Sequence, residues 1–73
     1  MLPDSIIRVL SSGSGIILDG SKVLNKTLEQ FASTANKSDA VLIIRNADKI
    51  ILDATMRIAD AGKGSVIFDL TSE

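Results

Sequence analysis

The sequence predicts an α/β fold of three α-β repeat units, with a three-stranded parallel sheet and the helices on one side of it, in a solenoid-like arrangement. The first observation behind this prediction is an internal repeat. An acidic residue, an Arg four residues later and a Gly-x-Gly triplet occur near the start of the chain and return in its last third at one constant offset: Asp4, Arg8, Gly13 and Gly15, then Asp53, Arg57, Gly62 and Gly64.

The second observation is the spacing of three short apolar runs. Their centres, Ile17, Leu42 and Ile67, stand 25 residues apart each time. A helical segment precedes every run and no hairpin signal joins two of them, so we expect parallel strands with right-handed crossovers. The units span about residues 3–20, 21–46 and 47–73 of one domain covering residues 1–73.

The composition indicates a small domain that needs additional burial. A chain of 73 residues buries only about 60% of the surface that its unfolded form exposes. The sequence has no Cys and no His, which excludes disulfides and the common zinc sites. Because 45% of the residues are hydrophobic, we expect the chain to hide apolar surface by associating with copies of itself.

The charge pattern excludes several partners. The net charge is -1 and the charged residues are scattered singly, so no basic stripe is available to follow a phosphate backbone and nucleic acid is not an expected partner. The N-terminus has no cationic leader, and no apolar run approaches the ~20 residues that cross a bilayer. We therefore expect a cytoplasmic protein without a membrane partner and without a cofactor.

The first unit is predicted to hold a helix over residues 4–12 and a strand over Ile16–Leu18. Pro3 and Asp4 are typical of a helix start, and the Ser-Ser-Gly-Ser-Gly run that follows is typical of a helix end. The apolar positions are spread around the helix, so we expect it to be buried on more than one side.

The second unit carries the clearest amphipathic segment, a predicted helix from Asn25, a good N-cap residue, to Lys37. Its apolar positions follow the helical spacing i, i+3, i+4 and i+7: Leu28, Phe31, Ala32 and Ala35. The strand that follows, over residues 40–44, is apolar at every position, as expected for the centre of a parallel sheet.

The third unit repeats this plan. Asp53 is predicted to cap a helix that continues to about Ala61, the two glycines end it, and Val66–Phe68 form the last strand. Alternation along the strands places Ile17, Leu42, Ile44 and Ile67 on the sheet face without helices, provided that their neighbours face the helices. Strands that are apolar on both sides leave this assignment open.

The middle unit resembles the leucine-rich repeat family, in particular its ribonuclease-inhibitor-like branch with one strand and one helix per unit. The match to the L-x-L-x-x-N core of that family is Val41-x-Ile43-x-x-Asn46, with Ser21 and Thr71 at the place of the Asn in the other units. The resemblance implies that the Asn46 side chain bonds to backbone after the strand. It also implies a non-catalytic binding or scaffolding role exercised through the strand side.

Two groups of residues have the chemistry of a site but not its arrangement. Gly62-Lys63-Gly64-Ser65 contains the residue types of a phosphate loop, but such a loop follows a strand and opens a helix, whereas this segment ends a helix and opens a strand. The scattered carboxylates, Asp19, Asp53, Asp60 and Asp69, have no nucleophile or base converging on them. We therefore expect no enzyme activity and no metal site.

The Asp and Arg residues of the first and third helices allow two interpretations. The simpler one is an i,i+4 pair within each helix, Asp4 with Arg8 and Asp53 with Arg57, worth a few tenths of a kcal/mol. The alternative is a recognition stripe on the helix side, which would also include Asp60.

The predicted function is a protein-interaction or scaffold module that self-associates through its sheet, as a homodimer or larger, either by stacking faces or by joining sheet edges. The alternative is a small regulator that binds another protein through the same apolar face. The residues predicted to make the contact are Ile17, Leu42, Ile44 and Ile67 on the sheet, with Asp19, Arg45 and Asp69 at its polar rim.

Overall fold

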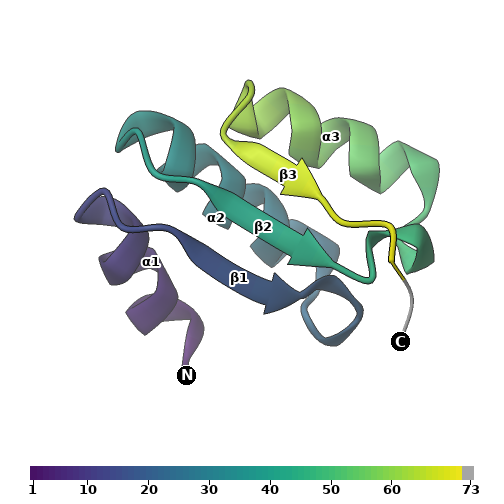
Figure 1. Ribbon diagram of the computed structural model, residues 1–73, viewed down its shortest axis with the longest axis horizontal. Coiled ribbons are helices and arrows are strands. Elements are labelled where there is room, and N and C mark those ends of the chain that lie inside the picture. Colours follow the sequence, from purple (N-terminus) through teal and green to yellow (C-terminus); the bar gives the residue numbers. More distant parts are fainter. Residues whose placement is uncertain (72–73) are drawn as a thin grey trace.

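The computed structural model describes residues 1–71 and shows an α/β fold with three α-β alternations (Figure 1). The helices are α1 (Pro3–Ser11), α2 (Asn25–Lys37) and α3 (Leu52–Gly62), and the strands are β1 (Ile16–Asp19), β2 (Leu42–Arg45) and β3 (Val66–Phe68). Two short 3₁₀ turns follow the first two strands, η1 (Gly20–Lys22) and η2 (Ala47–Lys49).

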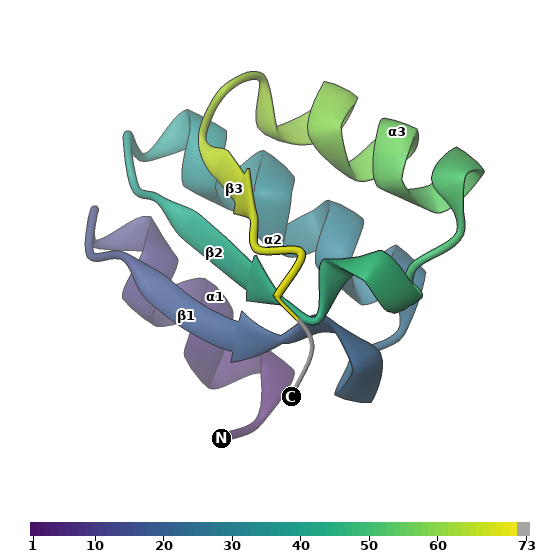
Figure 2. The ribbon, with the colours of Figure 1, turned by 45° about the vertical axis from the view of Figure 1, so that its right-hand side comes forward.

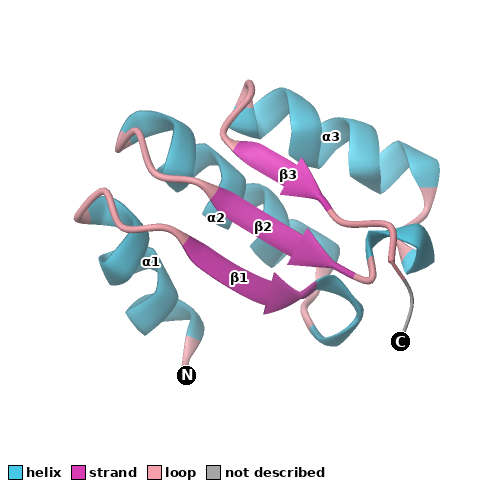
Figure 3. Cartoon of the chain, viewed as in Figure 1, coloured by secondary structure: helices cyan, strands magenta, loops and turns pink. Residues whose placement is uncertain are grey.

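The three strands form one parallel sheet in the order β1-β2-β3 (Figure 3). Each connection leaves the carboxyl end of one strand and passes through a helix behind the sheet. It then leads into the next strand, which lies parallel beside the first, so the crossovers are right-handed. β1 and β3 are both edge strands. The predicted parallel topology is therefore confirmed.

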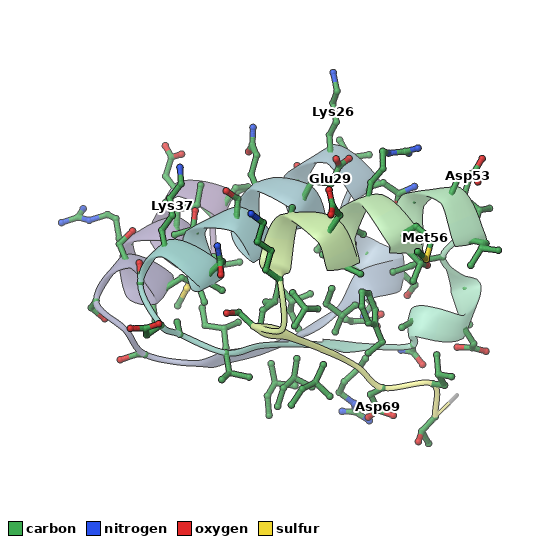
Figure 4. All side chains as sticks on the ribbon, turned by 90° about the horizontal axis from the view of Figure 1, so that it is seen from above. Lys26, Glu29, Lys37, Asp53, Met56 and Asp69 are labelled. Atoms are coloured by element: carbon green, nitrogen blue, oxygen red, sulfur yellow. The ribbon has the colours of Figure 1, made fainter. Side chains whose placement is uncertain are left out.

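All three helices lie on one face of the sheet, side by side in the order of the strands (Figures 2 and 4). α2 occupies the middle of this layer and packs against both α1 and α3. The core lies between α2 and β2, and its largest fully buried side chains are Phe31, Leu10, Leu28, Leu42, Ile44 and Ile58. We call the opposite side of the sheet, which no helix covers, the open face.

The helix boundaries follow the sequence prediction within one residue, but the caps do not. α2 begins at Asn25 as expected, yet its N-cap is Leu24, and the N-cap of α3 is Ile51 rather than Asp53. Neither helix has a side-chain cap. At the other end of α3, the left-handed residue is Lys63, with φ 46°, while Gly62 is the last helical residue.

Gly20 and Gly62 are required by close packing instead of by a left-handed backbone. A Cβ at Gly20 would lie 2.5 Å from Cγ2 of Ile44 and 3.1 Å from Cδ1 of Ile50. A Cβ at Gly62 would clash with Val66 Cγ2. Both glycines are buried, so each lets a turn or a helix end approach the core-facing side of the sheet.

The register of the sheet corrects the predicted spacing. Ile17 pairs with Ile43, and Ile43 pairs with Ile67, so equivalent strand positions stand 26 and then 24 residues apart in the sequence. The repeat of 25 residues is the mean of these two values. Because side chains alternate between the faces of a strand, this one-residue difference turns the middle strand over relative to the prediction.

The placement of Leu42 and Ile44 on the open face was therefore wrong. Both side chains are fully buried under the helices. The positions of β2 that lie on the open face are Ile43 and Arg45, in register with the edge-strand residues Ile17 and Asp19.

Candidate interaction surface

An isoleucine row crosses the open face, and it consists of Ile17, Ile43 and Ile67. The pairing register places these residues side by side on three adjacent strands. Ile17 is 64% exposed and Ile67 52% exposed, while Ile43 between them is half-buried. Val41, which is 43% exposed, precedes Ile43 by two residues and thus shares its side of the sheet. Apolar side chains therefore occupy the centre of the uncovered face.

A charged row lies next to the isoleucine row, two residues further along each strand. It consists of Asp19, which pairs with Arg45 in the register, and Asp69, which follows Phe68 at the end of β3. The Asp69 N–H donates to the Ile44 carbonyl at 2.8 Å and its carbonyl accepts from the Ala47 N–H at 3.0 Å, so the ladder continues to this position. Figure 4 shows Asp69 on the side of the sheet opposite the helices.

The two carboxylates of the charged row are held by equivalent turns. Asp19 Oδ1 accepts from the backbone N–H of Ser21 at 2.9 Å and from its hydroxyl at 2.6 Å. Asp69 Oδ1 accepts from the backbone N–H of Thr71 at 2.9 Å. The Ser or Thr two residues after each Asp thus donates to its carboxylate, and the same type of turn occurs at both edges of the sheet.

These hydrogen bonds favour the ionised carboxylates. The Ser21 hydroxyl, the Asn46 side chain and the Ser21 N–H lower the pKa of Asp19 to about 2. The backbone and side chain of Thr71 lower the pKa of Asp69, with a smaller contribution from the positive charge of Arg45. The charged row therefore carries a fixed pattern of minus, plus, minus at neutral pH.

A shallow depression of about 180 Å³ lies at the carboxyl end of β1 and β2, lined by Ile17, Leu18, Asp19, Arg45 and Asn46. Parallel sheets commonly bind ligands at this end of the strands. This depression is smaller than the ~300 Å³ at the lower limit of typical ligand pockets, and within residues 1–71 no three metal-ligating side chains gather in one place.

Five of the seven predicted contact residues come together on this surface: Ile17, Ile67, Asp19, Arg45 and Asp69. Leu42 and Ile44 do not, because they belong to the core. Sequence reasoning missed Ile43 and Val41, which take their places on the open face. It also missed the hydrogen bond of Asn46 to Asp19, since the resemblance to leucine-rich repeats implied a backbone partner for this side chain.

The helix side differs from the prediction in both expected i,i+4 pairs. Among the described residues, Asp4 and Arg8 form no ion pair. Arg57 Nε lies 3.6 Å from Glu29 Oε2, so this Arg pairs with the neighbouring helix α2 and not with Asp53 of its own helix. Gly62 and its neighbours end α3 and lead into β3, which agrees with the helix-end interpretation of this segment.

No protein-family model, curated protein or solved structure matches this chain. Within residues 1–71, no helix combines the length and the apolar character that spanning a membrane requires.

Proposed function

We propose that the chain is a non-catalytic interaction module that self-associates by stacking the open faces of two copies. The isoleucine row is the observation that carries this proposal. Three apolar side chains in register, two of them more than half exposed, form a contiguous apolar surface of the kind that marks an interface. A second copy offers the same row, and such isologous contacts are the commonest form of protein self-association.

The charged row favours one orientation of the two copies. A two-fold axis that crosses the strands at right angles lays one isoleucine row over the other and carries the two charged rows to opposite rims, where water reaches them. An axis parallel to the strands would place Arg45 over the second copy's Arg45 and Asp19 over its Asp69. Like charges directly opposed are destabilising, so we propose the first arrangement.

The repeat character of the chain supports the same role. We propose a solenoid-like architecture in which each α-β unit contacts only its neighbours, since α2 packs against both α1 and α3. The resemblance to leucine-rich repeats belongs to this proposal, because the strand side is the binding side in that family. The open face is small, so we expect a dissociation constant in the micromolar range or weaker.

The test is sedimentation equilibrium on the wild type beside Ile17→Asp and Ile67→Asp. Each change places a carboxylate in the isoleucine row of the proposed contact, and we expect the dimer dissociation constant to rise at least tenfold while the monomer stays folded by circular dichroism. Leu24→Asp is the matched control, because Leu24 is 78% exposed and precedes α2, away from the open face.

A wild type that stays monomeric at high micromolar concentration would refute self-association through this face. In that case the regulator alternative, in which the open face binds another protein, would replace it. Equal dissociation constants for Ile67→Asp and Leu24→Asp would place any self-contact elsewhere.

A further inference from the structure

Within residues 1–71, the outer edge of β1 presents backbone groups that no other strand engages. The Ile16 N–H donates to the Val41 carbonyl at 3.0 Å, and Ile16 pairs with Leu42 in the register of the sheet. In a parallel ladder, successive residues of a strand turn their backbone groups alternately to one side and the other. Ile17 and Asp19 therefore direct their N–H groups away from β2, toward the free edge.

An apolar depression of about 460 Å³ lies along this edge. It is lined by the strand and by the first residues of the chain: Met1, Ile6, Gly15, Ile16, Ile17 and Leu18. Ile16 and Leu18 face the helix layer and are half-buried, while Ile17 on the open face is 64% exposed. Because residues from both faces of β1 line it, the depression extends across the edge itself, where a further strand would pair. Its volume is within the range of sites that bind ligands.

α1 forms the floor of the depression on the helix side. It lies behind the sheet and extends past the free edge of β1, so that its N-terminal end lies beyond the strand (Figure 1). Ile6 of α1 contributes an apolar side chain to this floor. A segment added to the edge would thus contact the backbone of β1 and the side chains of α1 together. Extended peptides commonly bind in this way, by joining the edge of a sheet.

The position of α1 also decides which partner fits. A second copy that paired antiparallel through its own β1 would continue the sheet and bring its helix layer to the same side. The space on that side of the edge already holds the N-terminal half of α1. An extended peptide has no helix layer, so it can occupy the edge without displacing α1.

The groups along β1 favour a peptide of alternating character. Antiparallel pairing lets Ile17 exchange two hydrogen bonds with one peptide residue, and the two residues flanking that one then place their side chains in the depression. Apolar side chains suit these two positions, because Ile6, Ile16 and Leu18 surround them. The peptide residue opposite Asp19 lies beside a carboxylate that is ionised at neutral pH, so a Lys or Arg is favoured there.

We propose that the β1 edge binds an extended peptide segment of another protein as an added antiparallel strand, with apolar side chains at alternate positions and a basic residue beside Asp19. This site differs from the open face. Binding there needs no second copy of the chain, so the proposal is independent of the contact between open faces.

The probe is the synthetic peptide acetyl-Lys-Val-Thr-Val-Thr-amide, whose central Thr is intended to lie opposite Ile17. It is titrated into the isotope-labelled Ile67→Asp variant, which disrupts the face contact and leaves β1 unchanged. The amide proton resonances of Ile17 and Asp19 are expected to move downfield, because both N–H groups gain an acceptor. The Phe68 amide, which points to the free edge of β3, is the internal control and is expected to stay unchanged.

Two N-methylated forms of the peptide provide the decisive comparison. N-methylation of the central Thr removes the donor that faces β1, and it is expected to weaken binding about tenfold or more. N-methylation of the Val before it changes an amide that faces away from β1, and it is expected to weaken binding by less than about threefold. Glu in place of the Lys of the peptide is expected to weaken binding severalfold, because it meets the charge of Asp19.

Equal affinities of the two N-methylated peptides would overturn the proposal, as would a parent peptide that leaves the Ile17 amide unchanged. Shifts centred on Val41 and Ile43 would place binding on the open face and would also overturn it. Circular dichroism checks folding, and the wild type at low micromolar concentration replaces Ile67→Asp if that variant unfolds. A failure of the face contact shows differently, because the wild type and Ile67→Asp would then sediment alike whatever the peptide does.

Discussion

Asp19 shows how one side chain ends a strand and prepares a surface. Its carboxylate accepts two hydrogen bonds from Ser21 and a further one from Asn46, which closes the turn after β1 and fixes the negative charge beside Arg45. Asp69 and Thr71 repeat the arrangement at the other edge. These short Asp-x-Ser and Asp-x-Thr segments therefore serve both the turn and the charged row.

The lowered pKa of Asp19 predicts a pH dependence of stability. The folded-state pKa of about 2 lies below the ordinary value of 3.8, so the contribution of the carboxylate is complete above about pH 4 and is lost as the pH falls toward 2. Asp19→Asn is expected to flatten this part of the curve. Urea unfolding at pH values from 6 to 2 measures it, with Asp60→Asn as the control for loss of a charge. An unchanged slope in Asp19→Asn would contradict the prediction.

Leu42 and Ile17 are strand residues of similar size that differ strongly in burial. Leu42 is fully buried and Ile17 is 64% exposed. Leu42→Ala is expected to lower the free energy of unfolding by about 2–5 kcal/mol because it leaves a cavity in the core, whereas Ile17→Ala is expected to change it by less than about 1 kcal/mol. Urea denaturation of the two variants tests this. Similar losses in the two variants would show that the strand register assigns Leu42 and Ile17 to the wrong faces of the sheet.

At the scale of elements, the 3₁₀ turn η1 depends on the missing side chain of Gly20. Its approach to Ile44 and Ile50 connects the end of β1 to the core beneath β2. η2 follows β2 in the same way, and its first residue, Ala47, is also small and buried. Small residues at this place let the chain turn back toward the helix layer after each of these strands.

Gly20→Ala is accordingly expected to destabilise the fold by about 1–3 kcal/mol, since the added methyl group must displace Ile44 or the turn. Thermal unfolding followed by circular dichroism measures the loss. Ser14→Ala, an exposed position before β1, serves as the control. A Gly20→Ala variant as stable as this control would show that the turn can yield at little cost.

The hydrophobic periodicity of the sequence predicts the helices and strands, but it does not predict which face of the middle strand is buried. The spacing of Leu28, Phe31, Ala32 and Ala35 was sufficient to predict α2, because a helix of this kind shows its buried stripe directly. The face of β2 could not be derived, because all its central residues are apolar and an even repeat was assumed. The unequal spacing comes from the helices, because α2 has 13 residues and α3 has 11.

At the scale of the whole molecule, residues 1–71 form a three-stranded parallel sheet with all helices on one face, and no helix covers the other face. Its core centres on α2 and β2, and the outer units contribute only a part of their apolar side chains to it. The interaction role predicted from composition stays a prediction. The predicted placement on the open face holds for Ile17 and Ile67 and is wrong for Leu42 and Ile44, because the strand register differs from an even repeat.

Association should therefore stabilise the fold by mass action. We expect the melting temperature of the wild type to rise with protein concentration, since a contact made only by the folded chain adds to its stability. Scanning calorimetry from about 10 µM to 1 mM measures the shift. The Ile67→Asp variant, which disrupts the proposed contact between open faces, is expected to show a smaller shift. A constant melting temperature for the wild type would contradict that contact.

The alternation of backbone groups along the edge strands also predicts alternating rates of amide hydrogen exchange. In β2, every amide hydrogen is engaged with one neighbour or the other, so all of them should exchange slowly with solvent deuterium. In β1 and β3 only every second amide is engaged: Ile16 is protected and Ile17 is not, while Asp69 is protected and Phe68 is not. Exchange rates read residue by residue would thus alternate along both edges in the dilute protein.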